Sequence, residues 1–271
     1  MNLELLRSAG VVLPPGRMIT SDEDGGDARP PLWLSDGPDF PLGLWGRIRA
    51  VHERSGLWPL LLVPLEGDES FRPWATGELE PGRMSSPDSH DPSALLARWW
   101  QCHTHTGDED DPLAPAARAA VTAPFGRSWP GPARAGGDIT NADAEAVEYA
   151  EFFASFHARV RLGLVAAARG ADALALLGWE GPVNYEGDTG THAAVVRDWE
   201  ERFGVRVVGI GFATLHLSVA APPADREAAL AVAAEHFAFC PDNVWQGPRP
   251  QSLASYADRL IGANCWEFWW D

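Results

Sequence analysis

The most regular pattern of hydrophobic and polar residues lies in the last part of the chain, residues 192–271. Val195, Trp199 and Phe203 recur every four residues, and this spacing places them on one face of a helix. Gly204 follows directly, where a left-handed glycine commonly ends a helix. The pattern therefore predicts a helix that buries this face. Its N-cap is left open between Asp188, Thr189 and Thr191.

Two β-branched segments follow this helix, residues 205–210 and 214–219. The second alternates strictly between apolar and polar residues, as in a strand with one buried face. A three-residue connection between them indicates an antiparallel hairpin with its polar face toward solvent. The face expected inside carries Leu215, Leu217 and Val219, and the face expected outside carries Thr214, His216 and Ser218.

The chain ends in the aromatic run of residues 265–271, which is too apolar to extend freely into water. We expect it to form the last strand of the sheet, with Trp266, Phe268 and Trp270 on one face and Glu267 and Trp269 on the other. Before it, two helices are predicted. Residues 226–239 begin at the N-cap Asp225 and end before Pro241, and residues 253–260 are closed by Gly262.

The first part of the chain has fewer clear elements. Residues 42–54 have helical spacing, residues 57–65 form an apolar strand interrupted by two prolines, and Ser93 begins a helix through Trp100. Residues 101–142 are acidic and then rich in Ala, Pro and Gly, which is typical of a linker or a long surface excursion. Further on, a helix (144–157), a strand (161–168), a short helix (171–177) and a loop (178–190) are expected.

These elements predict an α+β fold with a mixed, mainly antiparallel sheet of about five strands and helices packed on it. The expected strands are 57–65, 161–167, 205–210, 214–219 and 264–270. We expect residues 1–100 to pack on a C-terminal domain of residues 143–271, because neither part alone has enough apolar pattern to fill a core. The segment 101–142 would connect them.

Several separated motifs of the C-terminal part resemble a known family. The chain reads WEERFG at 199–204, FATLHL at 212–217, AAEHFAFCPD at 233–242 and FWWD at 268–271. In this order the motifs resemble the bacterial domain-of-unknown-function family 4253, from about Leu162 to the end. The whole chain looks like an actinobacterial member with an N-terminal extension. The resemblance implies a compact C-terminal domain and supplies no activity, cofactor or catalytic residue.

Composition narrows the function classes. A net charge of −17 weighs against nucleic-acid binding, which needs clustered cations. All 21 basic residues are arginines, so lysine Schiff-base and P-loop chemistry are absent. No apolar run reaches the ~18 residues of a membrane span, and the N-terminus does not resemble a signal peptide. We therefore expect a cytoplasmic protein without a disulfide framework, since its three cysteines are widely spaced.

One pair of residues is a candidate for catalysis. His236 and Cys240 are four residues apart at the end of a predicted helix, and Asp242 follows. An imidazole beside a thiol can activate it as a nucleophile. Against this, the negative end of a helix disfavours a thiolate, and cysteine is commonly buried. A structural role is the alternative.

Three further groups are candidates for binding. Cys102, His103 and His105 precede an acidic run and are competent metal ligands, although their spacing matches no established site, and a solvated acidic loop is the alternative. No other cofactor is indicated. Two polar loops are candidate ligand-binding or interface sites, with ordinary turn and packing roles as the alternative. They contain Glu180, Asn184 and Tyr185 in the first, and Asp242, Asn243 and Trp245 in the second.

These observations favour a non-enzymatic interaction module for a protein partner, with a basic partner such as a nuclease toxin as one option. The reasons are the acidity, the absence of catalytic motifs and the 13 tryptophans, which could anchor an interface. Two alternatives stay open: a small hydrolase or transferase that uses Cys240 and His236, and a small-ligand-binding module built on the 180–188 loop. No membrane association is expected.

Overall fold

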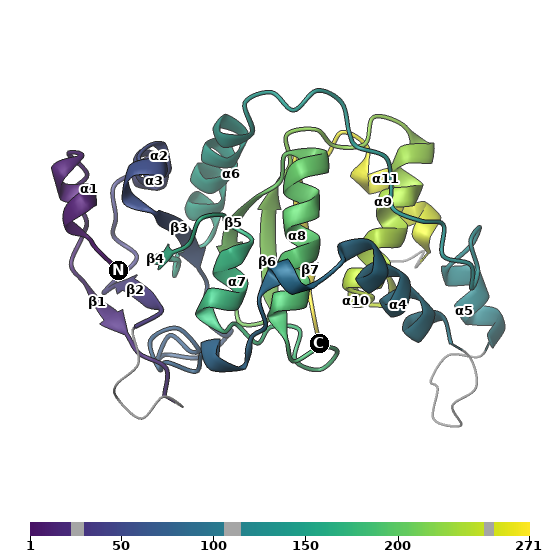
Figure 1. Ribbon diagram of the computed structural model, residues 1–271, viewed down its shortest axis with the longest axis horizontal. Helices are drawn as coiled ribbons and strands as arrows, with labels where there is room; N and C mark the ends of the chain where they lie inside the picture. The colour runs from purple at the N-terminus through teal and green to yellow at the C-terminus, as the bar shows by residue number, and fades with distance from the viewer. Residues whose placement is uncertain (23–29, 106–114, 247–251) are drawn as a thin grey trace.

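The computed structural model describes residues 1–22, 30–105, 115–246 and 252–271 (Figure 1). These residues form one seven-stranded sheet in the order β1-β2-β4-β3-β5-β6-β7. The strands are β1 (Gly16–Ile19), β2 (Leu32–Ser35), β3 (Leu57–Leu62), β4 (Arg161–Ala166), β5 (Arg206–Ile210), β6 (Thr214–Ser218) and β7 (Cys265–Trp269).

All neighbouring strands are antiparallel except β3 and β5, which run parallel. The predicted α+β class with a mainly antiparallel sheet is thus confirmed, with seven strands in place of about five. The two additional strands, β1 and β2, are four residues long. Prolines precede both segments, and such short runs carry too little alternation to be recognised as strands.

Helices cover both faces of the sheet. On one face, α7, α8 and α9 pack over a core that includes the rings of β7, and Figure 1 shows α7 and α8 in front of the strands. On the other face, α2 and α6 pack against β3 and β5. The helices are α1 (Glu4–Ser8), α2 (Leu44–Ala50), α3 (His52–Ser55), α4 (Pro92–Thr104), α5 (Pro115–Val121), α6 (Ala142–Phe156), α7 (Asp172–Leu177), α8 (Thr189–Phe203), α9 (Arg226–Phe239), α10 (Asp242–Trp245) and α11 (Leu253–Leu260), with 3₁₀ turns at Pro81–Arg83 and Pro87–Ser89.

The prediction that the polar face of the β5–β6 hairpin points to solvent is wrong. His216 is only 5% exposed and Ser218 is fully buried. Helix α6 covers this side, where the Phe153 ring lies 4.6 Å from the His216 ring. A hairpin pattern with one polar face does not reveal that a helix distant in sequence will cover that face.

The C-terminal strand has the predicted orientation. Trp266, Phe268 and Trp270 are buried, whereas Glu267 and Trp269 face outward from the core. The Trp199 ring of α8 stacks on Phe268, with 5.4 Å between ring centres. Aromatic contacts of this kind add to the apolar area that each ring removes from water. The buried rings of Trp266, Phe268 and Trp270 thus hold β7 against the core as the last strand of the sheet.

The caps of the C-terminal helices agree with the sequence. Asp188 is the N-cap of α8, where its carboxylate accepts the Gly190 N–H, and Gly204 ends the helix in the left-handed conformation. Asp225 caps α9 through the Ala228 N–H. Among the described residues, no helix is long and apolar enough to cross a membrane.

Residues 101–142 were expected to form a linker or a long surface excursion, and parts of this segment are instead helical or buried. Helix α4 is capped by Asp91, not Ser93, and it continues through Thr104, while α5 lies further along the segment. Ala133 is buried and its N–H donates to the Glu235 carboxylate, while its carbonyl accepts from Arg202 at 2.9 Å. The Arg202–Glu235 ion pair therefore anchors a segment that lacks apolar periodicity, because backbone hydrogen bonds need no side-chain pattern.

Candidate functional site

A cavity of about 630 Å³ opens at one end of the sheet. The parallel strands β3 and β5 both end there, and Val63–Leu65 and Gly211–Ala213 form its wall just beyond them. The chain end also lies there, with Trp269–Asp271 in the wall. Ligands of sheets with parallel strands commonly bind outside the carboxyl ends of those strands. This cavity is therefore the candidate functional site.

Four side chains on β6 and β7 form one polar wall of the cavity. Thr214 lies opposite Trp269 in the ladder, and His216 lies opposite Glu267. Because side chains two residues apart share a face of a strand, all four point to the same side. His216 Nε2 is 3.2 Å from Thr214 Oγ1, and His216 Nδ1 is 4.0 Å from Glu267 Oε1. The order hydroxyl, imidazole, carboxylate is that of a triad.

The electrostatic environment does not make His216 a general base for the Thr214 hydroxyl. Burial and, to a smaller extent, the neighbouring His157 together lower the pKa of His216 to about 3. Burial also lowers the pKa of His157, which lines the same cavity. Both imidazoles are consequently neutral at pH 7. A group with so low a pKa is a poor general base for a threonine hydroxyl, so the wall offers hydrogen bonds and no activated nucleophile.

A second wall comes from the segment after β3 and from the loop between α7 and α8, residues 178–188. Arg72 Nε donates to Glu78 Oε2 at 2.5 Å, and its guanidinium lies 5.4 Å from the Phe212 ring centre. Glu180 and Asn184 of the loop line the same cavity. The Asn184 side chain donates to the Asp271 carbonyl at 2.6 Å. Two of the candidate residues of the first polar loop thus border the cavity.

Other candidate binding residues hold the last strand in place. The Asp242 carboxylate accepts from the Tyr185 hydroxyl at 2.7 Å and from the Asp271 N–H at 3.0 Å. Asn243 donates to the Glu267 carbonyl at 2.6 Å and accepts from the Trp269 N–H at 3.1 Å. A side-chain amide here pairs with the outer edge of β7 as a neighbouring strand would. The Asp242 carboxylate and the Asn243 amide are therefore already engaged in hydrogen bonds within the protein, and a ligand could not use them without breaking these bonds.

Trp245, the remaining residue of the second loop, packs inward. Its ring lies 5.2 Å from the Phe237 ring and 5.0 Å from the Arg118 guanidinium. The side chain is therefore part of the packing between α9, α10 and α5.

The Cys240–His236 pair is not assembled as a nucleophile. The Cys240 thiol donates to the Trp269 carbonyl at 3.0 Å, and His236 Nδ1 bonds to the Tyr256 hydroxyl at 3.0 Å. Both residues are fully buried. Burial raises the pKa of Cys240 well above its ordinary value and lowers that of His236 to about 3. Neither the thiolate nor the imidazolium is favoured, and the geometry gives the pair a packing role.

The three candidate metal ligands are not gathered around one point. His103 packs edge-on against Tyr185, Phe237 and Trp245, and burial lowers its pKa to about 4. Cys102 and His105 are exposed. The described residues contain no group of three His, Cys, Asp or Glu side chains that could hold a metal ion. The acidic run 108–111 that follows lies outside the described residues.

The C-terminal part of the chain, which carries the sequence motifs, matches a known family model. Residues 161–271 match the family model DUF4253, a domain of unknown function. The resemblance predicted from the motifs is thereby confirmed for the C-terminal part of the chain. No curated protein and no solved structure matches this chain.

The DUF4253 region supplies only part of the cavity. Strands β5, β6 and β7 and the loop 178–188 belong to it, whereas β3, the segment around Arg72, and His157 precede it. Thr214, His216 and Glu267 were not among the predicted site residues. A signal existed in part, because each stood on the polar face of its predicted strand. The register that places His216 opposite Glu267 is not visible in the sequence.

Proposed function

We propose that this protein binds a small molecule in the cavity at the carboxyl ends of β3 and β5, without catalysing a reaction on it. The observation that carries the proposal is the cavity itself. Its volume of about 630 Å³ suits a small organic ligand, and apolar and polar side chains from separate segments of the chain converge on it. The neutral His216 can serve as a hydrogen-bonding group.

The proposal is tested by filling the cavity. Val183 lines it and is exposed, so Val183→Trp adds volume there without disturbing the core. Leu176→Trp, on the exposed surface of α7 and outside the cavity, is the matched control. A compound library is screened against the full chain by ligand-observed NMR. We expect specific binders that Val183→Trp abolishes and Leu176→Trp retains. Failure to find any binder with this pattern would refute the proposal.

A second candidate is the protein-interaction module expected from the sequence, in a cytoplasmic location. The number of tryptophans no longer supports this candidate, because most of them lie in the core and are not exposed at an interface. What favours it is an exposed aromatic pair on α6. Phe152 and Phe156 are 57% and 75% exposed, and their ring centres lie 5.2 Å apart. Apolar rings of this kind are costly to leave in water and typically anchor interfaces.

This second candidate is tested by affinity purification at low salt. The net charge of −17 predicts that a basic partner would be lost as salt screens the attraction. A stoichiometric partner should disappear when Phe152 and Phe156 are both replaced by Ser, while Leu176→Ser, the control, retains it. Absence of any stoichiometric partner, or a partner indifferent to the double replacement, would exclude this interaction site.

A further inference from the structure

Acidic side chains dominate the lining of the candidate cavity. The described residues that line it include five carboxylates and one guanidinium, that of Arg72, with Glu78 paired to Arg72 and Glu180 paired to Arg83. The two histidines in the wall, His157 and His216, both have lowered pKa values and add no positive charge at pH 7. The field inside a concave, partly enclosed site reflects the sum of these charges. The five carboxylates belong to Glu66, Glu78, Glu180, Glu267 and Asp271.

The chain already places one cation in this wall. The Arg72 guanidinium is held by the Glu78 carboxylate at 2.5 Å and lies over the Phe212 ring at 5.4 Å. A carboxylate and an aromatic face together are the two elements that recognise a guanidinium or ammonium group. This internal contact shows that the lining accommodates an organic cation.

The same two elements occur again in the wall formed by β7, where none of the cationic side chains that the structure describes lies between them. Glu267 and Trp269 lie on one face of the strand, and the Trp269 side chain is 40% exposed. Within the described parts of the chain, no aromatic ring or guanidinium stacks on the Trp269 ring, and the one basic side chain within 4.0 Å of the Glu267 carboxylate is the neutral His216. This pair is therefore open to a ligand.

The helix over this wall adds to the same field. His157 is the C-cap of α6, a helix of 15 residues, and it lines the cavity. The C-terminal end of a helix carries a partial negative charge that favours a nearby cation. Carboxylates, an open aromatic face and a helix C-terminus thus act in the same direction.

We infer that the ligand of this cavity is an organic cation, a molecule with an ammonium or guanidinium group that lies between Glu267 and Trp269. The inference rests on the proposed binding function and specifies its ligand class. The cationic group would pair with the Glu267 carboxylate and lie against the Trp269 ring, while Thr214 Oγ1 and the His216 imidazole bond to neutral polar atoms. The apolar residues of the opposite wall would contact the body of the ligand.

The test uses four probes of similar size and different charge: benzylamine, benzylguanidine, benzyl alcohol and benzoate. Their binding to the full chain is measured by titration calorimetry and ligand-observed NMR. We expect the two cations to bind at least about tenfold more tightly than the alcohol, and benzoate most weakly. Tenfold corresponds to about 1.4 kcal/mol, a modest value for a charge-assisted contact.

Two variants locate the cation. Glu267→Gln should weaken the binding of the cations about tenfold or more and leave that of benzyl alcohol unchanged. Trp269→Leu should weaken the cations more than the alcohol, because only a cation gains from the ring face. Glu53→Gln, on the exposed side of α3 and outside the cavity, is the matched control and should change nothing.

The outcomes separate the two proposals. If benzyl alcohol or benzoate binds as tightly as the cations, and Val183→Trp abolishes that binding, the cation inference is wrong and the cavity is still a ligand site. Cation binding that Glu267→Gln leaves intact also overturns the inference. If none of the four probes binds and the library screen finds no binder sensitive to Val183→Trp, both proposals fail.

Discussion

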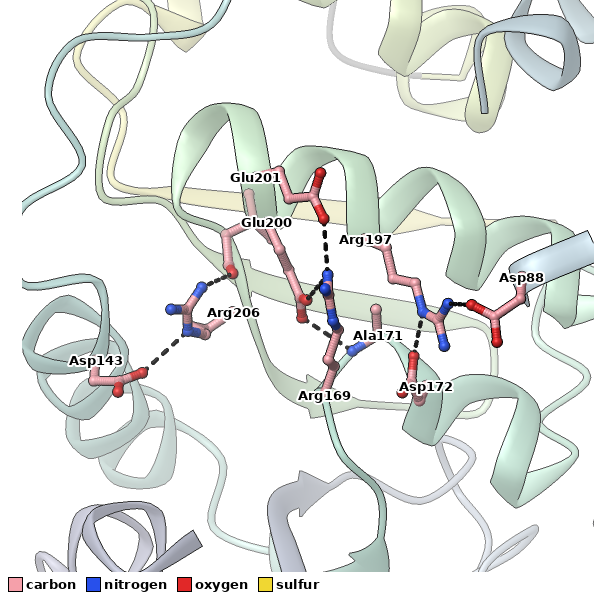
Figure 2. A network of polar contacts seen from close by, with 10 residues as sticks. Asp88, Asp143, Arg169, Ala171, Asp172, Arg197, Glu200, Glu201 and Arg206 are labelled. Carbon is pink, nitrogen blue, oxygen red and sulfur yellow. Dashed lines mark hydrogen bonds and ion pairs between the residues drawn. The ribbon is translucent and has the colours of Figure 1, made fainter. Parts of the chain in front are cut away.

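Glu200 on α8 predicts a measurable pH dependence of stability. Its side chain is 8% exposed, its carboxylate accepts the Ala171 N–H at 3.1 Å, and the Arg169 guanidinium lies 3.9 Å away (Figure 2). Burial nevertheless raises its pKa from 4.5 to about 7, because the loss of hydration outweighs these favourable contacts. The folded chain therefore binds a proton at Glu200 that the unfolded chain releases near pH 4.5.

The sign and size of the effect follow from this shift. A carboxyl group with a raised pKa in the folded state contributes its stability fully below the unfolded pKa, and the contribution is lost as the pH rises through the folded pKa. A shift from 4.5 to about 7 corresponds to about 3 kcal/mol of unfolding free energy. This loss is spread between pH 4.5 and about 8, and ionised Glu200 is a cost above that range.

Glu200→Gln removes the titration, while its amide oxygen can still accept the Ala171 N–H. The difference in unfolding free energy between Glu200→Gln and the unaltered chain should therefore rise by about 3 kcal/mol from pH 4.5 to pH 8. Urea denaturation followed by tryptophan fluorescence measures it. Glu201→Gln is the control, because Glu201 is the next residue, also pairs with Arg169, and is 68% exposed. A difference that does not change with pH would refute the reasoning.

Three further predictions concern the C-terminal part of the chain. Asn243→Ala should lower the unfolding free energy by about 1–3 kcal/mol in the same urea titration, because it leaves the Glu267 carbonyl and the Trp269 N–H without a partner; an unchanged unfolding free energy would contradict the role of these bonds. Glu235→Ala should cost about 3–5 kcal/mol, since it leaves Arg202 with Asp198 alone and removes the acceptor of the Trp199 Nε1–H and the Ala133 N–H; a cost below 1 kcal/mol would contradict the anchoring role. Cys240 should resist a thiol reagent until the chain unfolds, whereas the exposed Cys102 should react in the native protein; rapid modification of Cys240 would contradict its burial.

The sequence predicted those elements whose pattern is long and regular. The four-residue spacing of Val195, Trp199 and Phe203, and the alternation in 214–219 and 265–271, identify α8, β6 and β7. In these segments the apolar positions of the pattern face the main core, so periodicity identifies the element, although most polar positions of β6 and most of α8 are buried as well. Capping residues located several helix ends for the same reason, since a cap acts through bonds to residues next to it in sequence.

The candidate site depended on contacts between distant segments, which local patterns do not encode. Tyr185, Asp242 and Asn243 were candidate ligand-binding residues, with turn and packing roles as the alternative. Asn243 bonds to the last strand, Asp242 bonds to Asp271 just after it, and Tyr185 bonds to Asp242. A polar residue in a loop satisfies its hydrogen bonds with whichever partner the fold brings near. The sequence shows the donor or acceptor but does not show which partner it meets. His216 and Glu267 illustrate the reverse case, in which expected surface residues meet in a cavity wall.

The position of β3 links the DUF4253 region to the segment before it. In the sheet order, β3 lies between β4 and β5, pairing antiparallel with the first and parallel with the second. Both of those strands belong to residues 161–271, whereas β3 does not. Without β3, the strands of the matched region would separate into β4 alone and the β5–β6–β7 sheet, with unpaired edges on both. The segment before residue 161 therefore completes both the sheet and the cavity wall beyond β3, and the proposed ligand site is a property of the two parts together.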